Sequence, residues 1–141
     1  MIEIAESILI KASQNKIFDI ISDFDSYPEF LDEMEEVRVI KKSTKSATVF
    51  FKMNMMQTVN YTLKFNFNKP ESITWSFVEG DSILKENSGS WTLSEMGKDE
   101  MDVEYSVNLD FNIWLPSSVV KSVLSENLPK MLKKFKVRAE S

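Results

Sequence analysis

The sequence has 141 residues, of which 43% are hydrophobic and 11% aromatic, and it carries a formal net charge of −5. It contains no cysteine and no histidine, which excludes disulfides, thiolate chemistry, Ser–His and Cys–His nucleophile pairs and nearly every zinc site. The acidic balance argues against nucleic acid as a partner. We expect one domain over residues 1–141 that buries roughly 68% of its unfolded surface, with no metal and no cofactor.

The charge is distributed unevenly along the chain. Residues 1–40 hold 10 acidic and 3 basic side chains, a net charge of −7, whereas residues 116–141 hold 6 basic and 2 acidic ones, a net charge of +4. Two interpretations are open. The asymmetry reflects ordinary solvated faces, or the basic C-terminal end contacts an anionic partner.

The first segment is predicted to be a strand with one buried face. Isoleucine recurs on one parity, at Ile2, Ile4, Ile8 and Ile10. Glu6 shares that parity, so it either directs a carboxylate into an interior cavity or reaches water from a twisted strand. The segment has no basic leader pattern, and no apolar run approaches the roughly 18 residues of a membrane span. We therefore expect a cytoplasmic protein with no transmembrane segment.

Two short helices are predicted after this strand. Ser13 is a natural N-cap, and apolar residues with helical spacing follow it. Because Pro28 suits the first turn of a helix and not its interior, we expect a break near residues 25–26. The second helix would then carry Phe30 and Leu31.

Most of the remaining chain alternates between apolar and polar residues, as half-buried strands do. Six further strands are predicted, centred on residues 34–40, 47–55, 59–67, 73–77, 91–93 and 101–111. Together with the first strand they give one antiparallel sheet of about seven strands. Gly89, just ahead of Trp91, is expected to mark a bulge or bend.

Pro116 is expected to open a long C-terminal helix that lies along the sheet. Apolar residues keep three-to-four spacing from Val120 to Phe135, and Pro129 inside this span predicts a kink. Asn127 falls on the apolar face. It either satisfies a backbone carbonyl near the kink or offers an amide to a buried ligand.

A twisted sheet with a helix across its concave side leaves a cavity unless large side chains fill it. The candidate ligand-binding residues on this face are Phe51, Met53, Tyr61, Phe65, Trp75, Trp91, Tyr105, Asn127 and Met131. Buried tyrosine and tryptophan polar atoms need partners, which makes them natural ligand anchors. The alternative is that these side chains simply pack together and leave no cavity. Trp114, just before the C-terminal helix, either plugs one end or forms an exposed lip that meets a membrane or a partner.

Several stretches form an ordered pattern over nearly the whole chain: residues 12–31 (ASQNKIFDIISDFDSYPEFL), Trp75 with residues 79–81 (EGD), residues 89–91 (GSW) and residues 128–140 (LPKMLKKFKVRAE). This pattern resembles the START-like (SRPBCC) polyketide cyclase/dehydrase and lipid-transport superfamily, near its bacterial coenzyme-Q-binding-protein-like members. The resemblance implies an α+β helix-grip (START/Bet v 1-like) fold: a seven-stranded antiparallel sheet around a long C-terminal helix, with two short helices after the first strand. It carries over no catalytic motif.

Three functions stay open from the sequence. We favour binding or transport of a hydrophobic or amphipathic small molecule, such as a lipid, quinone or polyketide-like compound, because it needs only a cavity. The second is interaction with a ribosome or another large assembly through the basic residues between 130 and 138. The third is a cyclase or dehydratase in which Glu6, Tyr61, Tyr105 or another carboxylate with a raised pKa performs acid–base work. Transient membrane contact and the oligomeric state are left open.

Overall fold

The computed structural model describes residues 2–54 and 57–141. Its strands form one antiparallel sheet in the order β1-β7-β6-β5-β4-β3-β2, so β2 to β7 form a meander and β1 pairs with β7. The strands are β1 (Ile2–Ile10), β2 (Met34–Lys42), β3 (Ser46–Asn54), β4 (Thr58–Asn68), β5 (Ser72–Gly80), β6 (Leu84–Gly97) and β7 (Glu100–Phe111). The helical elements are α1 (Gln14–Ser22), the 3-10 helix η1 (Phe24–Glu29), α2 (Ser117–Ser122), the π-helix η2 (Val123–Asn127) and α3 (Leu128–Glu140).

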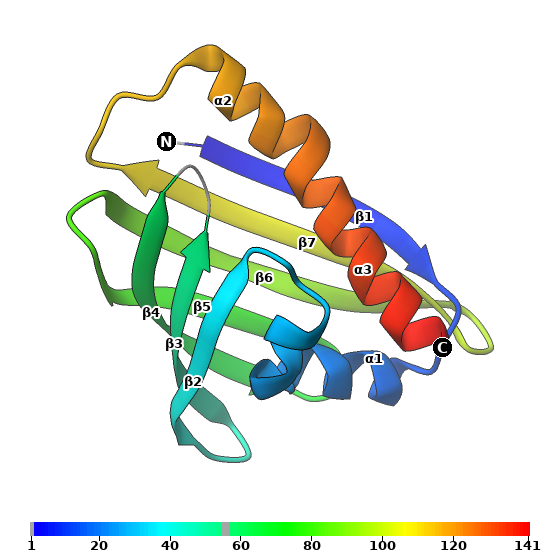
Figure 1. The fold of residues 1–141 in the computed structure, drawn as a ribbon. Helices are drawn as coiled ribbons and strands as arrows, with labels where there is room; N and C mark the ends of the chain where they lie inside the picture. The colour runs from blue at the N-terminus through cyan, green and yellow to red at the C-terminus, as the bar shows by residue number, and fades with distance from the viewer. Residues whose placement is uncertain (1, 55–56) are drawn as a thin grey trace.

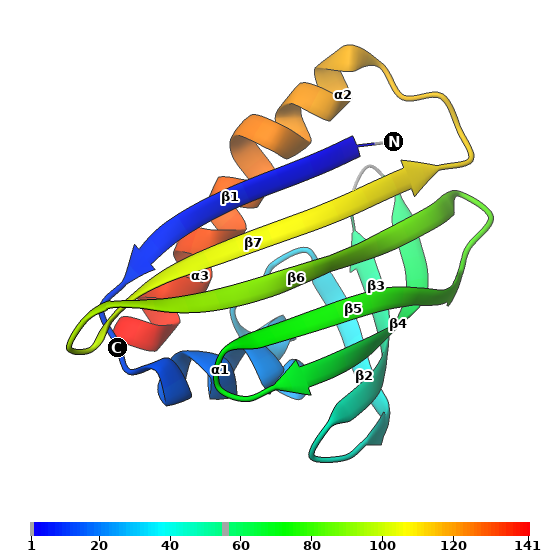
Figure 2. The same cartoon turned by 180° about the vertical axis from the view of Figure 1, so that it is seen from behind.

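The sheet curves around the C-terminal helical segment, as the resemblance implied. In Figure 1, α3 crosses the concave side of the sheet, while α1 and η1 lie at one end of it. The view from behind shows the strands in front and the helices beyond them (Figure 2). The antiparallel seven-stranded sheet with a C-terminal helix confirms the predicted α+β helix-grip fold.

The chain has a break between α1 and η1, as the sequence predicted, but the break is at Asp23 and not at residues 25–26. The Ser13 side chain caps α1 by accepting a hydrogen bond from the Lys16 backbone N–H at 3.2 Å, as expected. The change of helix type falls at Asp23, earlier than the predicted break. Pro28 lies inside η1, and Phe30 is its C-cap residue, so the second helix is earlier and tighter than predicted. The Tyr27 hydroxyl joins the two helices by donating to the Ile21 carbonyl.

Of the bulge or bend that the sequence predicted at Gly89, the bulge is absent. Gly89 keeps regular register with Trp75 on β5 and with Val107 on β7. A Cβ atom at this position would lie 2.6 Å from Cζ2 of Trp75 and would also overlap the Ser106 carbonyl oxygen. Glycine is needed here because an indole ring lies directly on the strand backbone.

The C-terminal helical path is interrupted, but not in the way expected of a proline kink. The π-helical turn η2 ends at Asn127, immediately before α3, and Pro129 then occupies the first turn of α3. Proline is well tolerated in a first turn, so the irregular backbone precedes it. No residue of α2 is buried, whereas Leu128, Leu132, Phe135 and Ala139 of α3 are.

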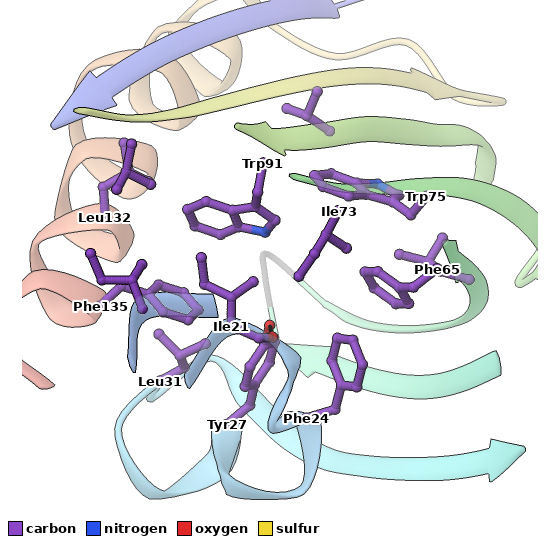
Figure 3. Close-up of a cluster of buried hydrophobic side chains, with 14 of the residues drawn as sticks. Ile21, Phe24, Tyr27, Leu31, Phe65, Ile73, Trp75, Trp91, Leu132 and Phe135 are labelled. Carbon is purple, nitrogen blue, oxygen red and sulfur yellow. Dashed lines mark hydrogen bonds between the residues drawn. The ribbon is translucent and has the colours of Figure 1, made fainter. Parts of the chain in front are cut away.

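The core is richest in aromatic side chains where α1 and η1 meet the sheet and α3 (Figure 3). Phe24 lies 4.4 Å from Phe65 between ring centroids, and Tyr27 lies 5.5 Å from Phe135. Trp91 on β6 contacts Phe135 from the other side, at 5.0 Å. These mixed tilted and edge-on contacts are the geometries that aromatic pairs prefer. They fill this end of the concave face with side chains.

Candidate ligand-binding cavity

Two adjoining hollows remain at the other end of the concave face. The inner hollow has a volume of ≈ 160 Å³ and lies between the sheet, the segment after η1 and the start of α3. The outer hollow has a volume of ≈ 500 Å³ and reaches the β7–α2 loop and α2. Both are lined by Glu33, Asn54, Val59, Leu109, Phe111 and Asn127. Because they share these walls, we treat them as one cavity with a deep part and a mouth.

The wall of the inner hollow is mostly apolar. The sheet supplies Ile4 from β1, Val59 from β4 and Val107 from β7, while Leu128 and Met131 face them from α3. These strand residues share a parity with buried neighbours along each strand, which directs them to the concave face. The polar groups of this wall are Glu33, Asn54, Tyr61, Asn87, Tyr105 and Asn127.

Five of the nine predicted ligand-binding residues line the inner hollow: Met53, Tyr61, Tyr105, Asn127 and Met131. Their role in binding stays a prediction. The other four, Phe51, Phe65, Trp75 and Trp91, are buried in the aromatic core and are not among the residues lining either hollow. Side chains thus fill one end of the concave face, as one interpretation expected, and a cavity remains at the other end, as the second interpretation expected.

Trp75 shows why parity alone did not separate the two groups. Its indole N–H donates to Oδ1 of Asn87 at 2.9 Å, so a protein side chain already satisfies the polar atom that was expected to anchor a ligand. Its ring lies 5.9 Å from Phe65 and 5.4 Å from Tyr105. Trp75 therefore forms the boundary between the packed core and the hollow.

Asn127 has the position that ligand contact requires. The residue is exposed, lines both hollows and makes no capping hydrogen bond. No hydrogen bond from its side chain to a described residue supports the alternative role of satisfying a carbonyl at the kink. The amide is left facing the cavity.

Glu6 and Trp114 do not have buried functional positions. Glu6 is partly exposed and is not among the lining residues of either hollow, in line with a twisted strand that reaches water. Trp114 is 83% exposed, so it does not plug the cavity. Its neighbours Ile113 and Leu115 line the outer hollow, whereas Trp114 is not among the lining residues of either hollow.

Sequence reasoning missed Glu33 and Asn87. Asn87 lies on β6 four residues before the buried Trp91 and therefore shares its inward-facing parity. A polar residue on that parity was the signal that could have identified it. Glu33 lies in the turn between η1 and β2, where no periodic pattern reports direction. Only the packing of this turn against the hollow reveals Glu33.

The two tyrosines of the inner hollow are hydrogen-bond donors and not bases. Burial raises the pKa of both Tyr61 and Tyr105 well above that of an ordinary tyrosine, and the nearby Tyr105 raises that of Tyr61 further. Tyr105 is only partly buried, and it is one of the residues that line the hollow. Both hydroxyls therefore stay protonated at neutral pH. A cyclase that used these tyrosines as acids would therefore need another group as its base.

No group of three or more metal-ligating side chains occurs among the residues that the structure describes. Within the same residues, no helix is both long and apolar enough to cross a membrane.

A curved antiparallel sheet that holds a helix over a hollow defines the helix-grip fold. The chain belongs to the family described as polyketide cyclase / dehydrase and lipid transport, whose model matches residues 10–136. A START superfamily protein from Mycobacterium smegmatis has a similar structure, with a TM-score of 0.85 over 98% of this chain and 97% of that one, at 17% identity.

Two curated relatives from Escherichia coli cover almost the entire chain. The persistence and stress-resistance toxin PasT of strain CFT073 is 23% identical over 99% of this chain and 88% of its own length. The ribosome association toxin RatA of strain K12 is 21% identical over the same shares of both chains.

Proposed function

We propose that this protein binds or carries a hydrophobic or amphipathic small molecule in the cavity beneath its C-terminal helix. The observation that carries the proposal is the wall of the hollow: apolar side chains from the strands and α3, with a few converging hydroxyl and amide groups. Small-molecule sites generally have this composition and volumes of roughly 300–1,000 Å³, a range that the outer hollow of ≈ 500 Å³ reaches. The family description, which includes lipid transport, supports the same class of function.

The proposal needs no catalytic step. Glu33 is the only carboxylate among the described residues that line the two hollows, and it lies where they join. The tyrosine hydroxyls keep their protons because burial raises the pKa of each. These groups are suited to orienting a bound molecule. The cytoplasmic location expected from the sequence stays a prediction.

The test is mass spectrometry of the protein purified from its native host, under conditions that keep ligands bound. We expect a co-purifying apolar or amphipathic compound. A Met131→Trp variant should lose it, because the larger ring would occupy the inner hollow that Met131 lines.

The matched control is Val137→Trp on the same helix. Val137 is 63% exposed and is not among the lining residues of either hollow, so this variant should retain the compound. A protein that is empty when purified natively, and that binds no apolar compound from a host extract, would contradict the proposal.

A second candidate function is association with ribosomes, and it rests on the name of one relative, ribosome association toxin RatA. The basic residues of α3 are only partly available for it. Lys134 pairs with Asp32 at 2.9 Å and Arg138 with Glu29 at 3.3 Å. Lys130 and Lys133 are exposed and make no ion pair with a described residue.

Sedimentation of the protein with ribosomes across a salt series tests this candidate. Binding through charge should weaken as salt rises, and the double variant K130E/K133E should weaken it at every salt concentration. The control is K41E/K45E, which makes the same charge change at exposed positions on β2 and in the turn between β2 and β3. If the two double variants sediment equally with ribosomes, Lys130 and Lys133 of α3 do not mediate the binding.

A further inference from the structure

The cavity wall has an unusual charge balance. Among the described residues that line the two hollows there is no lysine or arginine, while Glu33 lines both of them. Glu33 is partly buried, so its carboxylate is only partly screened by water. A buried anionic group on a ligand needs a cation or several strong donors to offset its desolvation. This wall offers no such cation and has a like charge at the junction of its two parts.

The wall does offer donors without partners. The Tyr105 ring is held by Trp75 and Trp91, with ring centroids 5.4 Å and 4.7 Å away. Its hydroxyl makes no hydrogen bond with any described residue, although the residue lines the inner hollow. Buried tyrosine hydroxyls usually have a partner, so this one is poised to donate to something in the cavity.

A second tyrosine reinforces this arrangement. The Tyr61 hydroxyl lines the same hollow, and its described partner is Sδ of Met53 at 3.5 Å. A thioether sulfur is a weak acceptor, so an oxygen atom that entered the hollow would replace it at little cost.

We infer that the ligand is an uncharged molecule with an acceptor oxygen, such as a ketone, ester or ether oxygen, which receives a hydrogen bond from the Tyr105 hydroxyl. Glu33 disfavours carboxylate and phosphate analogues. This inference rests on the proposed function, because it names the chemical class of the ligand in the same cavity.

Two probes of matched chain length, 2-undecanone and undecanoate, test the charge preference. Each is titrated into the protein by calorimetry at about pH 8, where the carboxylate of undecanoate is ionised. We expect 2-undecanone to bind roughly tenfold or more tightly than undecanoate, because the wall leaves an anion uncompensated. Glu33→Gln should strengthen undecanoate binding several-fold and so reduce the ratio of the two affinities.

Tyr105→Phe tests the anchor. It should weaken 2-undecanone binding about fivefold, the usual net effect of one neutral hydrogen bond. Tyr27→Phe is the matched control, because it removes a buried hydroxyl that donates to the Ile21 carbonyl and lies outside the lining of both hollows. Its folded form should bind 2-undecanone as the wild type does.

The outcomes separate this inference from the proposed function. Undecanoate binding as tightly as 2-undecanone, or equal affinities of the Tyr105→Phe and Tyr27→Phe variants, would overturn the inference while leaving a ligand-binding cavity. If neither probe binds and no apolar compound co-purifies with the native protein, the proposed function and the inference both fail.

Discussion

Gly89 shows how one residue separates the packed core from the hollow. Because Gly89 has no side chain, the Trp75 indole can pack closely against β6, where its N–H donates to Asn87. Trp75 in turn contacts Tyr105 and limits how far the aromatic core extends toward the cavity. The requirement for glycine here is steric and does not concern backbone conformation.

We therefore expect Gly89→Ala to be strongly destabilising. The added methyl group would overlap Trp75 and the Ser106 carbonyl oxygen, and overpacking of this kind costs about 1–3 kcal/mol. We predict a loss near the upper end of that range in chemical denaturation, together with a changed tryptophan fluorescence spectrum.

Gly97→Ala is the control for this prediction. The nearest atom to a Cβ there is Oε2 of Glu100 at 3.2 Å, at the free end of a flexible side chain. Its effect should stay within about 0.5 kcal/mol. If both variants lose the same free energy of unfolding, the close contact of Gly89 with Trp75 is not the cause of the destabilisation.

At the scale of elements, α3 is held in two ways that differ in strength. Its buried face packs Leu128, Leu132 and Phe135 against the sheet and η1. On its outer edge, Lys134 forms an ion pair with Asp32, and Arg138 forms one with Glu29. The Arg138 guanidinium also lies 4.6 Å from the Phe30 ring centroid. Asp32 and Glu29 are largely exposed, so screening by water leaves these pairs weak.

Phe135→Ala should therefore cost far more stability than Lys134→Ala. Phe135 is 3% exposed and contacts Tyr27, Phe30 and Trp91. Replacing a buried phenylalanine with alanine costs about 3–5 kcal/mol. Lys134→Ala should leave the urea midpoint nearly unchanged. A larger loss for Lys134→Ala, measured in the same titration, would mean that the ion pairs and not the aromatic contacts hold α3 in place.

These ion pairs also explain part of the uneven charge of the sequence. The acidic N-terminal residues Glu29 and Asp32 lie beside the basic residues of α3. Lys134 lowers the pKa of Asp32 by hydrogen bonding and by charge. The two charged regions thus partly neutralise each other within the fold, which leaves Lys130 and Lys133 as exposed cations of α3 without a described ion pair.

In the whole molecule, the three tyrosines of the chain lie on η1, β4 and β7, where Tyr27 and Tyr61 are buried and Tyr105 is partly buried. Burial is the largest cause of the raised pKa of Tyr27, Tyr61 and Tyr105. The folded state therefore holds these three protons more tightly than the unfolded chain does. Their contribution to stability is complete below about pH 10, the ordinary tyrosine pKa, and is lost as pH rises above it.

We predict a steep fall in the free energy of unfolding above about pH 10. Each tyrosine should contribute about 1.4 kcal/mol per pH unit while it is ionised only in the unfolded chain. Urea titrations at a series of alkaline pH values measure this slope, and Tyr27→Phe should reduce the tyrosine contribution by about a third. A slope that is the same in wild type and variant would refute the assignment of this loss to buried tyrosines.

The sequence by itself determined the sheet, its seven strands and the C-terminal helix, because strand and helix periodicities are local properties of the chain. It also marked the concave-facing residues, since strand parity decides which face a side chain occupies. Parity does not report how far along that face a residue lies from the helices that cover it. Phe65 and Tyr61, four residues apart on β4, therefore looked equivalent.

Only the tertiary structure decided that Phe65 is packed and Tyr61 lines a hollow. Phe24 from η1 fills the space beside Phe65, whereas Met131 of α3 faces the same hollow as Tyr61 without filling it. Glu33 and Asn87 entered the wall through the same long-range packing. A cavity is the volume that side chains from distant segments leave unoccupied, so its position and chemistry are fixed only when those segments meet.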